Sequence, residues 1–321
     1  MNYQRFNRVN GITKCILIDK GQVNVMNIIE VNQLTVDYGS NRGVFDLTFD
    51  LKKGEVLGFL GPNGAGKTTA IRQLMGFSTP DKGSCKILGK DPKTEAMSIQ
   101  KHIGYLPGEP VFMNNMNGLE FIRFISEMKG LKNINRAKEL CSYFELNPDM
   151  KIKKMSKGMK QKIGLICAFM QESDILILDE PTSGLDPLMQ NKFIKLIQEE
   201  KKKGTTILMS SHLFEEIERT CDRVVIIKNG KLMATQDVQI LKESQNKTFI
   251  LTFFNHETLK AFIAESPQAK VLNQTQVKVM VQGDVNPLIR LLAQYTIANM
   301  EMIHQTLENS FMHFYGEDQH D

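Results

Sequence analysis

The chain has 321 residues, 41% of them hydrophobic and 24% charged, which is typical of a globular protein with about two domains. A net charge of +4 is too mild to indicate a nucleic-acid partner, and no apolar run approaches the length of about 18 residues that spans a bilayer. The five cysteines are scattered without a C-x-x-C pair, which argues against a disulfide framework and a zinc site and favours reduced thiols in the cytosol.

The N-terminal residues are polar and lack the apolar core of a signal peptide. Regular periodicity starts near Ile28, and Met26 would be a natural first residue. We therefore expect residues 1–27 to be a poorly ordered extension, or the result of a start site placed too far upstream.

Two segments in which apolar and polar residues alternate, 31–38 and 44–51, predict strands. The first ends at Tyr38, whose ring could stack on a purine. The other interpretation is a half-buried aromatic side chain at a strand end, and spacing alone leaves both open.

The central motif of the chain is a glycine-rich loop between a predicted strand, 56–60, and a predicted helix that starts near Ala70. The loop consists of Gly61, Pro62, Asn63, Gly64, Ala65, Gly66, Lys67, Thr68 and Thr69. This order of residues predicts a phosphate-binding loop, in which glycines allow the backbone to approach a polyphosphate at the helix N-terminus. Lys67 is expected to reach the β- and γ-phosphates, and the Thr68 hydroxyl is expected to hold Mg²⁺.

A turn at 81–84 and a short strand at 85–88 follow, and from 94 to 162 the apolar spacing is helical. Within this region, 103–106 predicts a short strand that leaves through a loop rich in proline and glycine, which is either a joint between subdomains or a plain connector. Further on, Ser156 is a good N-cap for a buried helix. The lysines around it could belong to a site or to a solvated face.

Four aliphatic residues, 175–178, predict a buried strand that ends in Asp179 and Glu180. Acids at the carboxyl end of such a strand lie where open α/β sheets bind their ligands. Alone, the pair could be a strand-end cap, but a phosphate loop in the same chain favours chemistry. Asp179 then fits a contact to Mg²⁺, and Glu180 fits a general base that orients the attacking water.

A turn at 182–187 leads to an amphipathic helix, 188–203, which ends at Gly204, and then to a buried strand, 206–211. His212 follows that strand. A lone histidine is usually structural, but one at this edge of the sheet could reach a γ-phosphate. Segments 223–228 and 231–235 predict a hairpin about the dipeptide Asn229-Gly230.

The polar segment 238–246 predicts a boundary, and residues 241–321 predict a small α/β accessory domain. Its predicted strands are 248–254, 277–281 and 298–303, and its predicted helices are 258–264, 287–295 and 307–315. It carries no metal-ligand spacing and no glycine-rich loop.

From about 28 to 235, these motifs and their order resemble the ATP-binding cassette (ABC) family of ATPases. The resemblance implies an α/β P-loop NTPase fold of the RecA type, with a nucleotide-binding domain at 28–240 and a helical subdomain at about 94–162. It also implies that Tyr38 stacks on adenine, that Asp179 and Thr68 hold Mg²⁺, and that Glu180, His212 and Lys67 are catalytic. The implied dimer-contact loop is Ser183, Gly184, Leu185 and Asp186.

The chain departs from the family pattern in two places. The signature, L-S-G-G-Q in the family, is Met155-Ser156-Lys157-Gly158-Met159 here, which keeps the serine and one glycine. The glutamine that follows the strand at 103–106 is replaced by Gly108, and Glu109 is a possible substitute. Both departures resemble the subfamily that pairs with separate ABC-2-type membrane proteins in drug, bacteriocin and polysaccharide export, whose chains also end like residues 306–311.

The resemblance implies an ATPase that uses ATP and Mg²⁺ and closes as a head-to-tail dimer with a second copy or a paralogue. Ser156, Lys157, Gly158 and Met159 would face the nucleotide of the other subunit. The motion would pass to a polytopic permease through the region near 107–121, which implies a location on the inner face of the cell membrane, with no nucleic acid as partner. The alternatives are a soluble ABC ATPase that acts on ribosomes or nucleic acid, another class of P-loop enzyme such as a small-molecule kinase, and a module that binds ATP without hydrolysing it.

Overall fold

The computed structural model describes residues 7–9, 12–14, 18–19, 22–23, 26–40, 42–244 and 246–303. In the N-terminal part, four short strands form two antiparallel pairs: β1 (Asn7–Val9) with β2 (Ile12–Lys14), and β3 (Ile18–Asp19) with β4 (Gln22–Val23). The other residues of the predicted N-terminal extension, up to 25, lie outside the described residues, as does the predicted helix 307–315.

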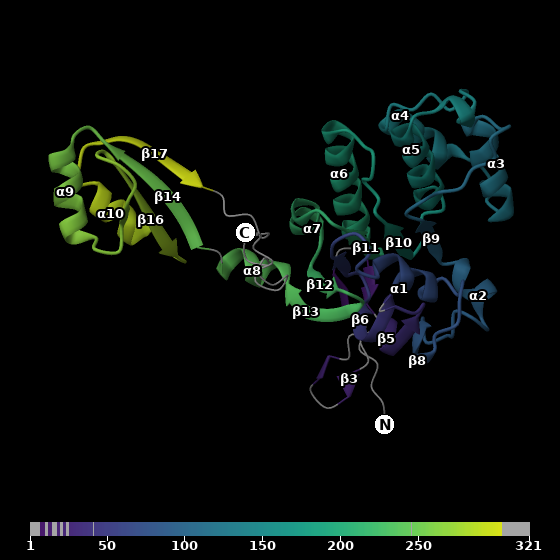
Figure 1. Ribbon diagram of the computed structural model, residues 1–321. Helices are drawn as coiled ribbons and strands as arrows, with labels where there is room; N and C mark the ends of the chain where they lie inside the picture. Colours follow the sequence, from purple (N-terminus) through teal and green to yellow (C-terminus); the bar gives the residue numbers. More distant parts are fainter. Residues whose placement is uncertain are drawn as a thin grey trace.

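A six-stranded sheet forms the centre of the larger unit (Figure 1), in the order β13-β12-β7-β11-β10-β9. Its strands are β7 (Val56–Leu60), β9 (Ile103–Leu106), β10 (Ile175–Asp179), β11 (Thr206–Ser211), β12 (Arg223–Lys228) and β13 (Lys231–Asp237). All neighbours are parallel except β12 and β13, which form the predicted hairpin about Asn229-Gly230. The strands β7, β10 and β11 are buried along their whole length, which agrees with the apolar segments 56–60, 175–178 and 207–209 in the sequence.

One face of this sheet packs on an antiparallel sheet and the helix of the phosphate loop. The antiparallel sheet has the order β6-β5-β8, with β5 (Asn27–Asp37), β6 (Gly43–Lys52) and β8 (Lys82–Ile87), and the helix is α1 (Lys67–Leu74). Side chains such as Phe49, Phe59 and Ile71 join the two sheets and α1 into one buried cluster. This packing fixes the strand that leads into the phosphate loop.

The opposite face of the six-stranded sheet is covered by α5 (Lys157–Phe169), α6 (Pro187–Lys203) and α7 (Phe214–Thr220). The predicted helical region also contains α2 (Ala96–Gln100), α3 (Gly118–Met128), α4 (Asn135–Tyr143) and the 3-10 turn η1 (Ile152–Lys154). Helices α3 and α5 begin at side-chain caps, because Asn117 accepts from the amide of Glu120 at 2.8 Å and Ser156 accepts from the amide of Met159 at 3.2 Å. The prediction that Ser156 is an N-cap is therefore confirmed.

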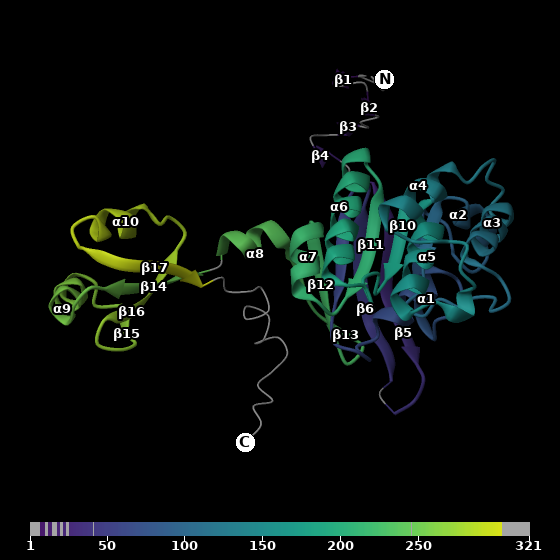
Figure 2. The ribbon, with the colours of Figure 1, turned by 90° about the horizontal axis from the view of Figure 1, so that it is seen from above.

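The remaining described residues form a second α/β unit, which Figure 2 shows beyond α8 (Val238–Ser244). The sequence predicts a boundary at the polar segment 238–246. Most of this segment is helix α8, whose first residue, Val238, is buried and donates its amide to the carbonyl oxygen of Asp222 at 2.8 Å. The unit has a sheet in the order β15-β16-β14-β17 and two helices. Its elements are β14 (Asn246–Phe253), α9 (His256–Glu265), β15 (Lys270–Val271), β16 (Gln276–Gln282), α10 (Asn286–Leu292) and β17 (Ile297–Ile303).

Candidate functional site

The phosphate loop runs from the end of β7 to the first turn of α1. Gly66 is the residue before the helix and has φ of 105°, in the left-handed region that glycine tolerates. A β-carbon on Gly66 would lie 2.8 Å from the carbonyl oxygen of Gly43, so the loop packs directly on the start of β6. The backbone therefore needs glycine here both for its conformation and for its close approach to β6.

Lys67 is almost fully buried, with an exposed fraction of 4%. Its Nζ donates to the carbonyl oxygens of Gly61 at 2.6 Å and Pro62 at 3.2 Å, and it lies 2.9 Å from Oε1 of Glu180. A buried ammonium is tolerated because these oxygens surround it. These contacts hold the positive charge of Lys67 beside the first residues of the phosphate loop.

Asp179 is the last residue of β10 and is fully buried. One oxygen, Oδ1, accepts from the hydroxyl of Ser210 at 2.5 Å, while Oδ2 has no hydrogen-bond partner within the described structure. The same Ser210 hydroxyl accepts from the amide of Glu180 at 2.9 Å. Ser210, on the neighbouring strand β11, therefore positions both acids.

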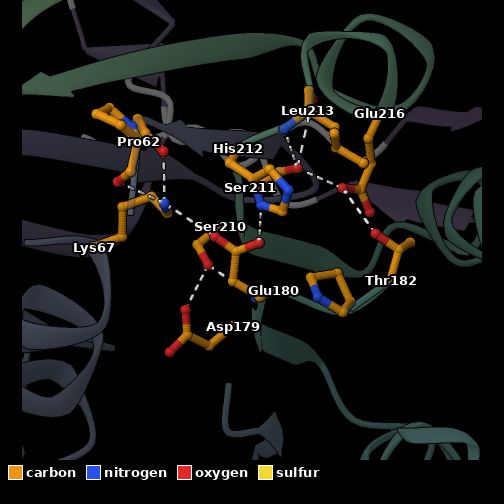
Figure 3. Close-up of polar contacts among 12 residues, drawn as sticks. Pro62, Lys67, Asp179, Glu180, Thr182, Ser210, Ser211, His212, Leu213 and Glu216 are labelled. Carbon is orange, nitrogen blue, oxygen red and sulfur yellow. Dashed lines mark hydrogen bonds and ion pairs between the residues drawn. The ribbon is translucent and has the colours of Figure 1, made fainter. Parts of the chain in front are cut away.

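Glu180 lies between two basic side chains (Figure 3). Its Oε1 faces Lys67, and its Oε2 lies 2.7 Å from Nδ1 of His212. The backbone of Glu180 has φ of 47°, which non-glycine residues seldom adopt, so the chain turns sharply where β10 ends. The parallel order of β10, β11 and β7 brings together Lys67, Glu180 and His212, although Lys67 lies more than a hundred positions before the other two in the sequence.

A third acid, Glu216 on α7, lies behind this group and is also buried. It accepts hydrogen bonds from the hydroxyls of Ser211 and Thr182. Burial, together with the nearby charge of Glu180, raises the pKa of the Glu216 carboxyl from 4.5 to about 7, although the two hydroxyl bonds act to lower it. The site therefore contains an acid that titrates near neutral pH.

The donor atoms beside the loop fit a magnesium ion. The unpartnered Oδ2 of Asp179 and the exposed hydroxyl of Thr68 are hard oxygen ligands, which Mg²⁺ prefers. Within the described ranges, no group of three or more His, Cys, Asp or Glu side chains could hold a metal by itself. Water molecules and phosphate oxygens of a nucleotide would complete the coordination.

Tyr38 lies just after the end of β5 and is 61% exposed. Its amide bonds to the carbonyl oxygen of Arg42 at 2.8 Å, which closes the turn that holds it. A tyrosine that leaves most of its ring open to solvent does not fit the half-buried interpretation, and the ring face is available for stacking. Its contact with adenine remains a prediction.

The signature residues and the dimer-contact loop pack against each other. A β-carbon on Gly158 would lie 2.5 Å from the carbonyl oxygen of Gly184, so these two backbones nearly touch. The stem of Lys157, the residue that replaces a family glycine, lies over Gly184, whose β-carbon would be 3.1 Å from its Cγ. Ser156 and Lys157 are exposed at the start of α5. The lysine is thus accommodated by packing on the dimer-contact loop.

The loop after β9 approaches Asp179 through Gly108 and not through a long side chain. A β-carbon on Gly108 would lie 3.0 Å from Oδ2 of Asp179. Glu109 is exposed. The prediction that Glu109 substitutes for the family glutamine remains a prediction, and the observed neighbour of the acid is the backbone of Gly108.

Besides Glu216, sequence reasoning missed two residues that support this site. Ser210 binds both acids, and the Gln161 amide donates to the carbonyl oxygens of Glu180 at 3.1 Å and Pro181 at 2.9 Å. Ser210 stands among buried strand residues, and Gln161 is a polar residue buried within a helix. For Ser210, the available signal was a polar residue at the end of a predicted buried strand, whereas Gln161 stands between two lysines and gave no signal.

A glycine-rich loop at the start of a helix, next to an acidic strand end in a parallel sheet, defines a P-loop NTPase. A family model described as "ABC transporter" matches residues 44–183. The chain is 34% identical over 307 residues to the uncharacterized ABC transporter ATP-binding protein YhcH of Bacillus subtilis (strain 168), which covers 90% of this chain and 96% of that protein. The chain therefore belongs to the ABC transporter ATP-binding proteins.

Two further comparisons agree with this family. The bacitracin transport ATP-binding protein BcrA of Bacillus licheniformis is 37% identical over 223 residues, which is 68% of this chain and 73% of that protein. A solved structure of the ATP binding subunit of an ABC transporter is 32% identical, with a TM-score of 0.62, and covers 67% of this chain and 92% of that one. Both matches span about two thirds of the chain.

Proposed function

We propose that this protein hydrolyses ATP to drive an ABC exporter through a separate membrane permease. The observation that carries the hydrolysis is the position of Glu180, whose two carboxylate oxygens face Lys67 of the phosphate loop and His212. A carboxylate held in this way beside a phosphate loop is placed to orient and deprotonate a water molecule.

Each side chain of the site has a role in this proposal. The Lys67 ammonium binds the β- and γ-phosphates, and the loop amides with the N-terminus of α1 add to the positive field. Mg²⁺, held by Asp179 and Thr68 with the phosphates, would neutralise charge that develops on the phosphate oxygens. Glu180 takes the proton of the attacking water, and His212 binds the γ-phosphate and holds Glu180 in place.

The exposed residues at the start of α5 support a dimer. Ser156 and Lys157 point to solvent, next to the dimer-contact loop, Ser183–Asp186, on which Gly158 packs. In the proposed dimer, this surface of one copy meets the nucleotide held by the phosphate loop of the other copy, or of a paralogue. Closure by ATP and opening after hydrolysis then form the transport cycle, since ATP binds the closed state more tightly.

A groove supports the permease as partner. It has a volume of about 700 Å³ and lies between the end of β9, α2 and α3. Several apolar side chains in and beside it are exposed, Met97 by 81%, Val111 by 90% and Met128 by 71%. Exposed apolar surface of this kind is typical of a protein interaction site, and an apolar cytoplasmic segment of the permease fits it. Among the described residues, no helix has the length and hydropathy that crossing a membrane requires.

Export as the direction is supported by relatives, one of which is a bacitracin transport ATP-binding protein and another a probable multidrug ABC transporter ATP-binding protein of Escherichia coli. The proposal places the protein on the inner face of the membrane through its partner. A soluble role on ribosomes or nucleic acid has no observation in its favour.

The test of hydrolysis is the variant Glu180→Gln. We expect its kcat to fall by a factor of about 10² to 10⁴, because the amide cannot accept the proton of water. ATP should still bind, so the variant should accumulate as an ATP-bound dimer in size-exclusion chromatography. A turnover rate equal to that of the wild-type chain would contradict the role of Glu180.

The test of the partner is affinity purification of the tagged chain from detergent-solubilised membranes. We expect a polytopic membrane protein in roughly equal amount, and its loss in the double variant Met97→Glu, Val111→Glu. The matched control is Ile240→Glu, which changes a residue of α8 that is 62% exposed and lies outside the groove. Ribosomal or DNA-bound proteins in place of a membrane protein would overturn the permease proposal and leave the ATPase chemistry intact.

A further inference from the structure

We infer that Glu216 is a positioning residue of the hydrolysis site, which ties the loop that carries His212 to the segment that follows Glu180. The inference rests on the proposed function, because it concerns the geometry of Glu180 and His212 during hydrolysis. Glu216 does not belong to the phosphate loop, the acidic strand end or the signature, and it touches none of the nucleotide-facing residues predicted from the sequence.

The Glu216 side chain lies where two loops leave the sheet (Figure 3). Its Oε2 accepts from the hydroxyl of Ser211 at 2.5 Å and from the hydroxyl of Thr182 at 3.3 Å. The residue is only 4% exposed, and its Oε1 has no hydrogen-bond partner within the described structure. Burying a carboxylate in such a position costs free energy. Its hydrogen bonds to the two loops offset part of that cost and hold the loops together.

Glu216 is linked to the loop that carries His212 through Ser211, and we call its hydrogen bonds to Ser211 and Thr182 the tie. The Ser211 hydroxyl donates to Glu216 and accepts from the amide of Leu213 at 2.9 Å. The residues on both sides of His212 are therefore held by one hydroxyl, which Glu216 orients. His212 in turn contacts Glu180 at 2.7 Å, so a shift of this loop would move the imidazole away from the carboxylate.

On the acidic side, the tie acts through Thr182, two residues after Glu180. The strands β10 and β11 are paired up to Asp179 and Ser210, and their backbone register ends there. Beyond that point, the segment after β10 continues into the dimer-contact loop, and the segment after β11 continues to His212. Glu216 supplies a side-chain link between them at the place where the backbone ladder has stopped.

The ionisation of Glu216 is part of this arrangement. The charged and titratable groups near it are Glu180 and His212 on the loops, Glu215, Glu218 and Arg219 on α7, and the buried thiol of Cys221 after α7. Its pKa is raised to about 7, chiefly by burial and further by the charge of Glu180. An ionised carboxylate accepts stronger hydrogen bonds than a neutral acid or amide, so the tie should strengthen as the pH rises through neutrality.

The experiment compares the steady-state ATPase of the full chain with Glu216→Gln, Glu216→Ala and the matched control Glu215→Gln. Glu215 is the preceding residue, is exposed, and pairs with Arg219 at 3.1 Å, so its substitution changes the same chemistry outside the site. We expect kcat to fall about tenfold in Glu216→Ala and about threefold in Glu216→Gln, which keeps an acceptor oxygen. The KM for ATP should stay within about twofold, and Glu215→Gln should match the wild type.

The pH profile separates positioning from a merely structural role. We expect the ratio of wild-type kcat to that of Glu216→Gln to rise as the pH goes from about 6 to about 8. Other ionisations cancel in this ratio, because the two chains share every other titratable group. A ratio that does not change with pH, or a loss that appears only in KM, would overturn the inference.

A second pair of variants covers the case in which Glu216→Ala does not fold. Thr182→Val removes one hydroxyl with little change in shape, and we expect kcat to fall about threefold. In a Thr182→Val background, Glu216→Gln should have a smaller effect than in the wild type, because the shared hydrogen bond is already lost. Additive effects would contradict the tie. If the wild-type chain itself fails to hydrolyse ATP, or Glu180→Gln is equally active, the proposed function fails, and this inference fails with it.

Discussion

The six-stranded sheet and the C-terminal four-stranded sheet differ most in the polar groups that they bury. In the first, charged residues such as Lys67, Asp179 and Glu216 lie buried near one edge. In the second, the buried polar residues within the described range are Thr248 and Ser266, neither of which is charged. Burying a charge costs free energy that must be offset by partners or ligands. Glu55 and Glu200 are also buried, but they pair with Arg223 and Lys203. We therefore expect the chemistry at the carboxyl edge of the parallel sheet, where Oδ2 of Asp179 has no hydrogen-bond partner among the described residues.

The packing of the two sheets explains part of this difference. The parallel strands β7, β10 and β11 are covered on both faces, so a water-poor edge forms where they end. In the C-terminal unit, Phe249, Leu251 and Phe253 of β14 point to the helices, and the residues between them face the other side of the sheet. Among the described residues of this unit, the packing encloses no charged side chain.

Matched deletions in the two cores give the largest expected effect. Leu251→Ala in β14 and Ile177→Ala in β10 each remove a side chain that is fully buried. Each should lower the free energy of unfolding of its own unit by about 2–5 kcal/mol, because a cavity remains. Hydrogen exchange measured by mass spectrometry reports the two units separately. We expect Leu251→Ala to keep its kcat within about twofold and Ile177→Ala to lose activity. Loss of ATPase activity in both variants would break the comparison.

The variant Ser210→Ala tests whether the buried charges depend on their hydroxyl partner. It removes the donor to Oδ1 of Asp179 and the acceptor of the Glu180 amide. Leaving buried groups unpaired costs about 1–3 kcal/mol, so we expect kcat to fall by about ten- to a hundredfold. The control Ser142→Ala changes an exposed serine of α4 and should leave kcat unchanged. Equal rates in the two variants would show that Ser210 does not position the acids.

The pH dependence of stability sharpens the case for a costly buried acid. Because the folded-state pKa of Glu216 is about 7 against an ordinary value of 4.5, the folded chain holds this proton more tightly than the unfolded chain between those pH values. The contribution of Glu216 to stability is therefore present at low pH and is lost as the pH rises toward 7. Urea titrations should show that the free energy of unfolding of the wild type falls relative to that of Glu216→Gln as the pH rises from 5 to 7. Above pH 7 the difference between the two should no longer change. A difference that is constant with pH would contradict the raised pKa.

The sequence by itself determined much of the architecture. Continuous apolar runs predicted β7, β10 and β11, the dipeptide Asn229-Gly230 predicted the hairpin, and Ser156 predicted the start of α5. These features are local: a turn residue, a cap or an apolar period acts on its immediate neighbours. The boundary expected at the polar segment 238–246 stays a prediction. That most of this segment is helix α8, with Val238 buried and its amide bonded to Asp222, could not be predicted locally, because it depends on residues outside the segment.

Only the tertiary structure decided how the site is assembled. Motif order indicated Lys67, Glu180 and His212, but the ion pairs that join them follow from the parallel register of three strands. Ser210, Gln161 and Glu216 carry no motif, since a serine, a glutamine and a glutamate acquire a role only from what they touch once buried. Their hydrogen bonds cross between elements that are distant in sequence, and the free energy of such contacts is defined by the packed core and not by any segment of the chain.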